Sequence, residues 1–213
     1  MTTALLLPLG LGLLAVPALF LDLPMANWIA SGGMSHWPGG IKKLIELSEV
    51  FAKGESVAVI LLAAIVLDPR GVRLLPRLIG ASGGAGLLAD LIKLGIARQR
   101  PRIADLNGAV GETFQPWTAA LRASDLQSFP SAHAATTVGL ALGLSYFFPR
   151  GCWLFAALAL LACLQRIECQ AHFPSDVLCG AAIGALVGTI CTQNQFLGRW
   201  FARCDIFPTP PTH

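Results

Sequence analysis

The sequence predicts an all-α, polytopic membrane protein built as one bundle of six transmembrane helices. Of its 213 residues, 54% are hydrophobic and only 13% are charged, whereas roughly a quarter of the residues in a soluble domain are charged. The apolar segments extend from one end of the chain to the other, which argues against a soluble domain with a single anchor. We expect one domain over residues 1–206 and a disordered, Pro-rich tail over residues 207–213.

Six apolar segments define the expected helices, because each can supply most of the roughly 20 residues that a helix needs to cross a bilayer. They cover residues 4–22, 50–67, 74–97, 130–148, 152–168 and 174–192, with polar or Pro/Gly-containing breaks between them. No Lys or Arg precedes the first segment and no clear cleavage site follows it, so we expect a retained helix and not a signal peptide. The second segment is uninterrupted only from Val57 to Leu67, so that helix has to recruit residues upstream of Val57.

Residues 23–49 are expected to form a connection along the membrane surface. They carry Trp28, Trp37, Lys42 and Lys43, and aromatic rings and lysines are stable where lipid meets water. An anchoring role explains these residues without any part in chemistry.

Glycines recur at every fourth position in the last helix (Gly180, Gly184, Gly188) and in the fourth (Gly139, Gly143). This spacing puts the glycines of each helix on one face and lets the backbones of neighbouring helices approach closely. We therefore expect these glycines to be packing residues.

The unusual polar residues of the chain are concentrated in two connections. If successive helices alternate in direction, the connection after the third segment and the connection after the fifth emerge on the same membrane face, so one polar site at one face is expected. The short loops of the opposite face carry Arg70, Arg73 and Arg150, which indicates a cytoplasmic location. The protein is expected in the bacterial inner membrane, with its site facing outward to the periplasm or exterior.

Composition disfavours two kinds of ligand, nucleic acid and metal ions. The net charge of +3 comes from scattered residues, with no run of Lys or Arg that would follow a nucleic-acid backbone. The six cysteines form no CxxC pair, and most lie in apolar stretches where a thiol packs as a small hydrophobe. No His, Cys and Asp cluster has the spacing of a metal site. No pattern in the sequence specifies an oligomeric state.

Three cations, Lys93, Arg100 and Arg166, lie at the ends of apolar helices, where a cation is costly unless water or an anionic ligand stabilises it. Guanidinium groups bind phosphate oxygens in a bidentate fork and Lys supplies a point charge, so the three together favour a phosphate site. For any one of them alone, snorkelling to lipid headgroups is the first explanation. Asp90 lies one helical turn before Lys93 and can pair with it, and we expect Asp90 and Glu168 to be structural.

The segment from Phe129 to His133 opens the fourth helix. The fixed backbone φ angle of Pro130 suits the first turn of a helix. Ser131 offers a hydroxyl beside the unpaired backbone amides of the helix start, which attract anions. His133, in that first turn, has the chemistry to donate a proton to a leaving oxygen. A polar residue at the membrane boundary is the alternative interpretation of this histidine.

The segment from His172 to Asp176 opens the sixth helix, and its four-residue spacing lets the carboxylate of Asp176 reach back toward the imidazole of His172. A carboxylate on one ring nitrogen fixes the tautomer and leaves the other nitrogen free to attack phosphorus. The pair therefore has the features of a nucleophile and its orienting group. A helix cap beside an unrelated histidine is the alternative for this segment taken alone.

In this order along the chain, these residues resemble the three motifs of the type 2 phosphatidic acid phosphatase family. The motif K-x6-R-P matches Lys93 through Arg100 and Pro101, P-S-G-H matches Pro130, Ser131, Ala132 and His133, and S-R-x5-H-x3-D matches Arg166, His172 and Asp176. Two positions depart from the family pattern. Ala132 replaces the usual Gly, and Gln165 replaces the Ser before Arg166, which removes a hydroxyl from the expected phosphate pocket.

The resemblance implies hydrolysis of a lipid phosphate monoester or diphosphate without a metal or other cofactor. His172 would be the nucleophile that forms a phosphohistidine, Asp176 would orient it, and His133 would protonate the departing group and later activate water. The phosphate would be held by Lys93, Arg100, Ser131, Ala132 and Arg166. The implied partners are the lipid bilayer and a lipid phosphate in it: phosphatidic acid, phosphatidylglycerophosphate, polyprenyl diphosphate and lipid A phosphate all present the same anionic group.

Other functions use the same residues. A lipid phosphotransferase would pass the phosphoryl group from His172 to another alcohol instead of water. A nonenzymatic lipid-binding or transport protein would use the cations only to bind lipid headgroups. The two histidines and Asp176 argue against the second. A soluble vanadate-dependent haloperoxidase has similar motifs, but the apolar composition of this chain disfavours a soluble protein. We expect substrate specificity in the connection 98–129, with Phe114 and Trp117, and in grooves between helices.

Overall fold

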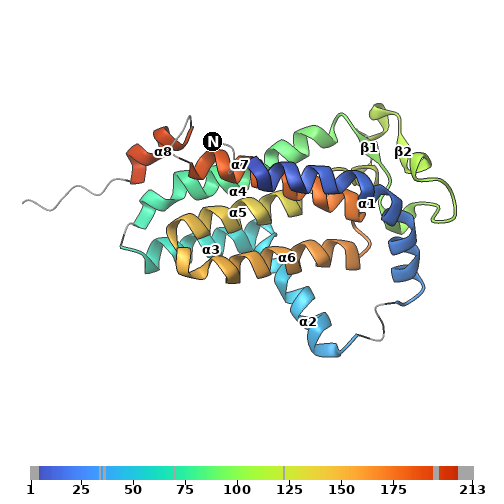
Figure 1. Ribbon diagram of the computed structural model, residues 1–213, viewed down its shortest axis with the longest axis horizontal. Helices are drawn as coiled ribbons and strands as arrows, with labels where there is room; N and C mark the ends of the chain where they lie inside the picture. The colour runs from blue at the N-terminus through green and yellow to red at the C-terminus, as the bar shows by residue number, and fades with distance from the viewer. Residues whose placement is uncertain are drawn as a thin grey trace, which may run out of the picture.

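The computed structural model describes residues 5–33, 35, 37–69, 71–121, 123–193 and 197–205. Within these ranges the protein is helical, as predicted, with eight α-helices and one two-stranded sheet. The predicted disordered tail, and the loop residues Arg70 and Arg122, lie outside the described residues. Figure 1 shows most of the helices running side by side along the long axis of the molecule.

The helices are α1 (Leu6–Ala30), α2 (Gly39–Ser48), α3 (Gly54–Leu67), α4 (Leu75–Lys93), α5 (Ala132–Phe147), α6 (Cys152–Glu168), α7 (Pro174–Thr192) and α8 (Leu197–Asp205). A 3₁₀ turn, Glu49–Phe51, separates α2 from α3. The long connection after α4 contains the antiparallel strands β1 (Ala97–Arg98) and β2 (Phe114–Gln115), which pair Ala97 with Gln115 and Arg98 with Phe114.

Three of the described helical segments are long and apolar enough to cross a membrane: α1, α7 and the segment Pro149–Glu168 that contains α6. The segments Gly39–Phe51 and Gly54–Leu67 pass the same test only as a pair, which is bent by 74°. Helix α5 has 16 residues, short of the ~20 that a bilayer needs, and α4 carries Arg77, Asp90 and Lys93. The apolar helices are those of a membrane protein, with three or four candidate spans among the described residues.

Helix α1 is longer than the first apolar segment and continues to Ala30, so residues 23–30 are not part of a surface connection. Asp22 is the last residue of the predicted segment 4–22, and a carboxylate is costly in lipid. The side chain of Asp22 instead turns inward, is fully buried, and is bonded to Arg98 and Ser175. The helix can therefore pass through this position without exposing a charge to lipid.

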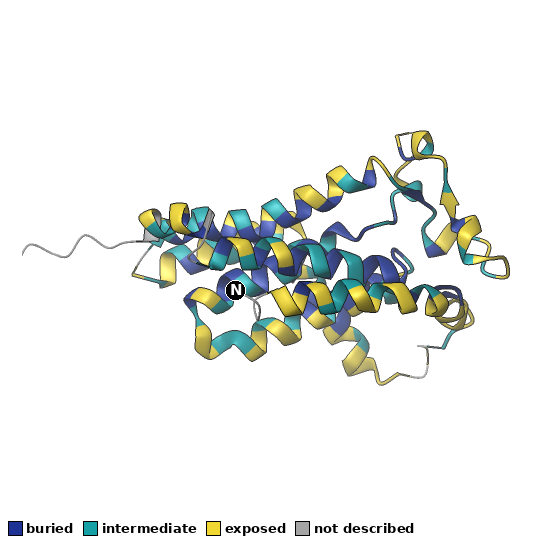
Figure 2. Ribbon diagram, turned by 45° about the horizontal axis from the view of Figure 1, so that its top comes forward, coloured by how far each residue is buried: buried dark blue, intermediate teal, exposed yellow. Residues whose placement is uncertain are grey.

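Helix α5 lies at the centre of the bundle and packs against α4, α6 and α7. The predicted close approach of glycine-bearing helices is confirmed: a Cβ at Gly139 would collide with the carbonyl of Ala81 in α4, and a Cβ at Gly180 or Gly184 would collide with the carbonyl of Ser131 or Ala135. Figure 2 shows the consequence, with buried residues on the facing sides of the helices and exposed residues outside.

The two polar connections meet at one end of the bundle, as the alternation of helix direction predicted. The backbone N–H of Arg102 donates to the carbonyl of Gln170 (3.4 Å), and the N–H of Ser131 donates to the carbonyl of Asp176 (3.0 Å). In Figure 1 this is the end that carries β1 and β2, whereas α8 lies at the other end. The predicted site residues are therefore assembled at a single end of the helices.

Candidate active site

His172 lies in the turn between α6 and α7, and its ring is buried. Its Nδ1 is 2.7 Å from the carbonyl oxygen of Ser128. Because a carbonyl can only accept a hydrogen bond, Nδ1 carries the proton and the neutral ring keeps the lone pair of Nε2. The ring is thus held in the tautomer that a nucleophile at Nε2 requires.

Asp176, in the first turn of α7, lies near His172 but does not make the expected hydrogen bond to it: its Oδ2 is 4.0 Å from Nδ1. Other donors occupy the carboxylate. Oδ2 accepts from the hydroxyl of Ser128 (2.6 Å) and the N–H of Phe173 (2.9 Å), and Oδ1 accepts from Arg98 (2.5 Å). Asp176 therefore supplies a nearby negative charge, while Ser128 sets the tautomer of His172.

Ser131, Ala132 and His133 form the start of α5. Ser131 is the N-cap, and its hydroxyl oxygen accepts from the N–H of Ala134 (3.3 Å). This bond satisfies one of the donors left free at a helix start. His133 is half-buried, and the charges of Arg166, Lys93 and Arg100 act on it. His133 therefore lies near the three predicted phosphate-binding cations.

The three cations come from three separate elements, and a neighbouring group holds each one. Lys93, at the end of α4, is 3.1 Å from Asp90, which confirms their predicted pairing. Arg100 donates from Nε to the carbonyl of Ser124 (3.2 Å). Arg166, in α6, donates to Glu49 and Gln165, at 2.6 Å in each case. Gln165, where the family has Ser, thus contributes its side-chain carbonyl to the orientation of Arg166.

Electrostatics favours a neutral His172. Burial and the nearby charges of Arg100 and Lys93 hold the pKa of this imidazole well below its ordinary value of 6.5, although the bond to Ser128 acts in the opposite direction. A neutral imidazole beside cations is available as a nucleophile toward a phosphate that those cations hold.

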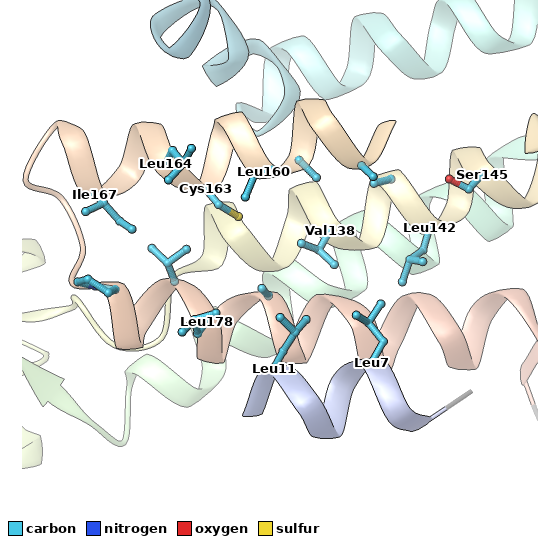
Figure 3. A pocket seen from close by; sticks show the side chains of 16 residues that line it. Leu7, Leu11, Val138, Leu142, Ser145, Leu160, Cys163, Leu164, Ile167 and Leu178 are labelled. Atoms are coloured by element: carbon cyan, nitrogen blue, oxygen red, sulfur yellow. The ribbon is translucent and has the colours of Figure 1, made fainter. Parts of the chain in front are cut away.

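Two grooves lie along the bundle, and they differ in chemistry. The groove of about 450 Å³ between α1, α5, α6 and α7 is lined by apolar side chains apart from Ser145 and Cys163 (Figure 3). A second groove, of about 680 Å³, runs between α3 and the pair α4 and α5, and its lining includes Lys53, Asp90 and His133 as well as Val57 and Leu87. The second groove joins an apolar helix surface to a predicted catalytic residue, His133.

Asp22, Glu49, Arg98 and Ser128 lie at this end and were not among the predicted site residues. Asp22 could have been found as an acid inside an apolar run, which is itself an indication of a buried partner. Ser128 acts on His172 through its backbone, for which the sequence has no signal. Within the described residues, no group of three or more His, Cys, Asp and Glu side chains has the arrangement of a metal site.

Comparison with known proteins agrees with the motifs. The PAP2 superfamily profile matches residues 75–200, which contain all three motifs. The chain is 37% identical over 122 residues to a lipid A 1-phosphatase of Rhizobium johnstonii, an alignment that covers 57% of this chain and 46% of the relative. A lipid A 1-phosphatase of Rhizobium etli is 35% identical over 100 residues, covering 47% of this chain and 41% of the relative.

A third relative is named for a different lipid. The decaprenylphosphoryl-5-phosphoribose phosphatase of Mycobacterium tuberculosis is 35% identical over 135 residues, which cover 59% of this chain and 68% of that protein. The chain thus spans less than half the length of the two Rhizobium relatives and about two thirds of the mycobacterial one. No solved structure matches the chain significantly.

Proposed function

This chain belongs to the PAP2 superfamily, and from that membership and the arrangement at its polar end we propose that it is a membrane lipid phosphatase that acts through His172. The observation that carries the proposal is the hydrogen bond from His172 Nδ1 to the carbonyl of Ser128, at 2.7 Å. It leaves Nε2 as an unprotonated nucleophile among Lys93, Arg100 and His133, whose charges act on the ring.

In the first step Nε2 of His172 attacks phosphorus, a P–N bond forms, and the P–O bond to the lipid breaks. His133 protonates the departing oxygen, for which its place in the first turn of α5 is suited. The imidazole becomes positively charged in the phosphohistidine, and the carboxylate of Asp176, 4.0 Å from Nδ1, stabilises that charge. Lys93, Arg100 and Arg166 offset the charge of the phosphoryl oxygens.

In the second step His133 takes a proton from water, the water oxygen attacks phosphorus, and the P–N bond breaks to release inorganic phosphate and His172. Ser131 and Ala132 complete the proposed phosphate site at the N-terminus of α5, where backbone N–H groups attract an anion. No metal takes part in either step. A phosphotransferase would differ only in the acceptor that attacks the phosphohistidine.

The proposed substrate is a lipid phosphate or diphosphate that enters from the bilayer. Support comes from the groove between α3 and α4, because one opening combines apolar side chains such as Leu61 and Leu87 with His133. The relatives are named for lipid A and for a decaprenyl-linked sugar phosphate, so we propose these two lipid classes first. Phosphatidic acid and phosphatidylglycerophosphate complete the set to be compared.

For the membrane, we propose a single domain with six crossings, made by α1, the bent pair of α2 and α3, and α4 to α7. The placement of both polar connections at one end supports alternating helix directions. The arginines in the loops at the other end, such as Arg73 and Arg150, support a cytoplasmic location for that end and an outward-facing site in the inner membrane.

The test is phosphate release from a panel of these lipids in detergent or liposomes with EDTA present, for the wild type, His172→Ala and Cys169→Ser. The exposed Cys169 lies three residues before His172 and is the matched control. We expect release by the wild type and the control and none by His172→Ala. With a ³²P-labelled lipid, the wild type should retain an acid-labile, alkali-stable phosphoryl group on quenching.

Two results would argue against hydrolysis through His172. Full activity of His172→Ala would exclude the proposed nucleophile. Labelling of the protein without phosphate release, followed by release of label only when an alcohol is added, would identify a phosphotransferase.

A further inference from the structure

Arg98 is a fully buried cation that the proposed mechanism does not use. It lies in β1, two residues before Arg100, and each of its three guanidinium nitrogens donates a hydrogen bond. Nε donates to the Thr113 hydroxyl (3.1 Å), Nη1 to the Ser175 hydroxyl (2.8 Å) and to Asp176 Oδ1 (2.5 Å), and Nη2 to Asp22 Oδ2 (2.6 Å). A buried charge is stable only when paired and hydrogen-bonded in this way.

Two aromatic rings fix the plane of this guanidinium. Its central carbon lies 4.6 Å from the ring centre of Phe114 and 4.4 Å from that of Phe173. Phe173 directly follows His172, so the same group that bonds to Asp176 also packs against the residue next to the proposed nucleophile. Stacking and a multi-donor fork are properties of Arg that Lys does not share.

Asp22 connects this cation to the first helix. Its Oδ1 accepts from the N–H of Ser175 (3.0 Å), and its Oδ2 accepts from the Ser175 hydroxyl (2.5 Å) as well as from Arg98. The N–H of Ser175 belongs to the first turn of α7, which has no intrahelical acceptor. Asp22 therefore caps α7 from α1, immediately before Asp176.

We infer that Arg98 and Asp22 are positioning residues for the reaction: they hold Asp176 and the first turn of α7 in the place from which Asp176 stabilises charge on His172. The inference rests on the proposed function. Arg98 anchors Oδ1 of Asp176, which leaves Oδ2 directed to Ser128 and 4.0 Å from His172. Arg98 pairs with both Asp22 and Asp176. These three residues contain two carboxylates and one guanidinium, so together they carry a net negative charge beside the imidazole.

This charge balance gives opposite effects for the two residues. Asp22→Asn removes a negative charge, which destabilises protonated His172 and moves the acid limb of the pH profile to lower pH. Arg98→Gln removes a positive charge and moves that limb to higher pH. The other charged groups that face His172, namely Lys93, Arg100, His133 and Asp176, are the same in both variants.

The experiment measures kcat, KM and the pH dependence of kcat/KM for purified full-length protein with the best lipid of the panel. We expect kcat to fall about 100-fold in Arg98→Gln, as for a displaced catalytic group, and by less in Asp22→Asn, with KM little changed. The double variant Asp22→Asn/Arg98→Gln restores the charge balance, so its acid limb should return toward that of the wild type. Arg98→Lys should leave the acid limb of the pH profile unchanged but lower kcat, because Lys keeps the positive charge and lacks the several donors of the guanidinium group.

Arg77→Gln is the matched control for a buried arginine. Arg77 is also fully buried, donates to the carbonyls of Cys191 and Gly198, and lies 4.4 Å from the ring centre of Tyr146, near the opposite end of α4. It should lower the melting temperature without moving the pH profile. If the Arg98 and Asp22 variants behave like this control, with unchanged kcat and pH profile, the residues are structural and the inference is wrong.

The assay separates this failure from failure of the proposed function. A wild type that is active and a His172→Ala variant that is inactive establish the phosphatase, whatever Arg98 and Asp22 do. A wild type that releases no phosphate from any lipid overturns both. If Arg98→Gln does not fold, Asp22→Asn is the deciding variant, because Asn keeps an oxygen for the N–H of Ser175 while it loses the charge and the second acceptor for Arg98 and the Ser175 hydroxyl.

Discussion

Ser128 binds both His172 and Asp176: its carbonyl oxygen lies 2.7 Å from Nδ1 of His172, and its hydroxyl donates to Oδ2 of Asp176 at 2.6 Å. One buried residue thus connects the proposed nucleophile to the carboxylate that would stabilise its charge. The two bonds come from different parts of the residue, so they can be separated by mutation.

Ser128→Ala removes the hydroxyl and keeps the carbonyl. We expect the tautomer of His172 to be unchanged, while Asp176 loses a donor and moves, so kcat falls about tenfold and the free energy of unfolding falls by about 1–3 kcal/mol. Steady-state kinetics and thermal unfolding in detergent measure the two effects. Thr192→Val removes a hydroxyl that donates to the carbonyl of Gly188 at the far end of α7. This control should lower the free energy of unfolding and leave kcat unchanged. A normal kcat in Ser128→Ala would show that the hydroxyl does not hold Asp176 in place.

The pH dependence follows from the lowered pKa of His172. The neutral ring is the nucleophile, so kcat/KM should fall with decreasing pH only below the ordinary value of 6.5. Arg100 is one cause of the lowered pKa. Removing this cation in Arg100→Gln stabilises the protonated ring, so the acid limb should move to higher pH and the overall rate should fall.

Arg102→Gln is the control for that shift, because Arg102 is exposed and pairs with Asp125. The ionisation of the substrate is common to both variants and cannot produce a difference between them. A downward shift in Arg100→Gln, or equal shifts in the two variants, would contradict the assignment of the acid limb to His172.

The sequence was sufficient to predict the meeting of the three motifs. Lys93, His133 and His172 lie on different helices and turns, but alternation of helix direction was enough to put them at one end of the bundle. Close contact between α5 and α7 was also predictable, because glycines at every fourth residue have few uses other than close packing.

The arrangement around Asp176 was not predictable, for a physical reason. The four-residue spacing brings His172 and Asp176 near each other but does not show which donors compete for the carboxylate. Arg98 and Ser128 donate to this carboxylate, and they lie 78 and 48 residues before Asp176 in the sequence. In the same way, the bend of 74° between α2 and α3 and the pairing of Glu49 with Arg166 depend on tertiary contacts that no local pattern records.

Glu49 is paired with Arg166, one of the cations that we propose to bind phosphate. Its Oε1 lies 2.6 Å from Nη2 of Arg166, and its Oε2 lies 3.0 Å from Lys53. A phosphate that binds Arg166 has to displace this carboxylate, so Glu49→Gln should tighten competitive inhibition by inorganic phosphate or vanadate by up to about tenfold. Glu46→Gln, one turn earlier on an exposed position of α2, should leave the inhibition constant unchanged. Weaker inhibition in Glu49→Gln would mean that the carboxylate orients Arg166 instead of competing for it.

Gly180 sets the distance between α7 and the start of α5, where Ser131 and His133 lie. A Cβ at this position would collide with the carbonyl oxygen of Ser131, and that carbonyl already accepts the first hydrogen bond of α5 from the N–H of Ala135 (3.1 Å). Gly180→Ala should therefore separate His133 from His172, lower the free energy of unfolding by about 1–3 kcal/mol, and reduce kcat.

Gly10→Ala provides the comparison, because Gly10 lies inside α1 and a Cβ there would meet nothing within 4 Å. That substitution should raise the free energy of unfolding by about 0.4–1 kcal/mol, since alanine has less backbone freedom to lose on folding. Thermal unfolding in detergent and kcat on the same lipid give both readouts. If Gly180→Ala were as stable and as active as Gly10→Ala, the start of α5 would have room to move, and close packing of α5 on α7 would not be what fixes the distance between the two histidines.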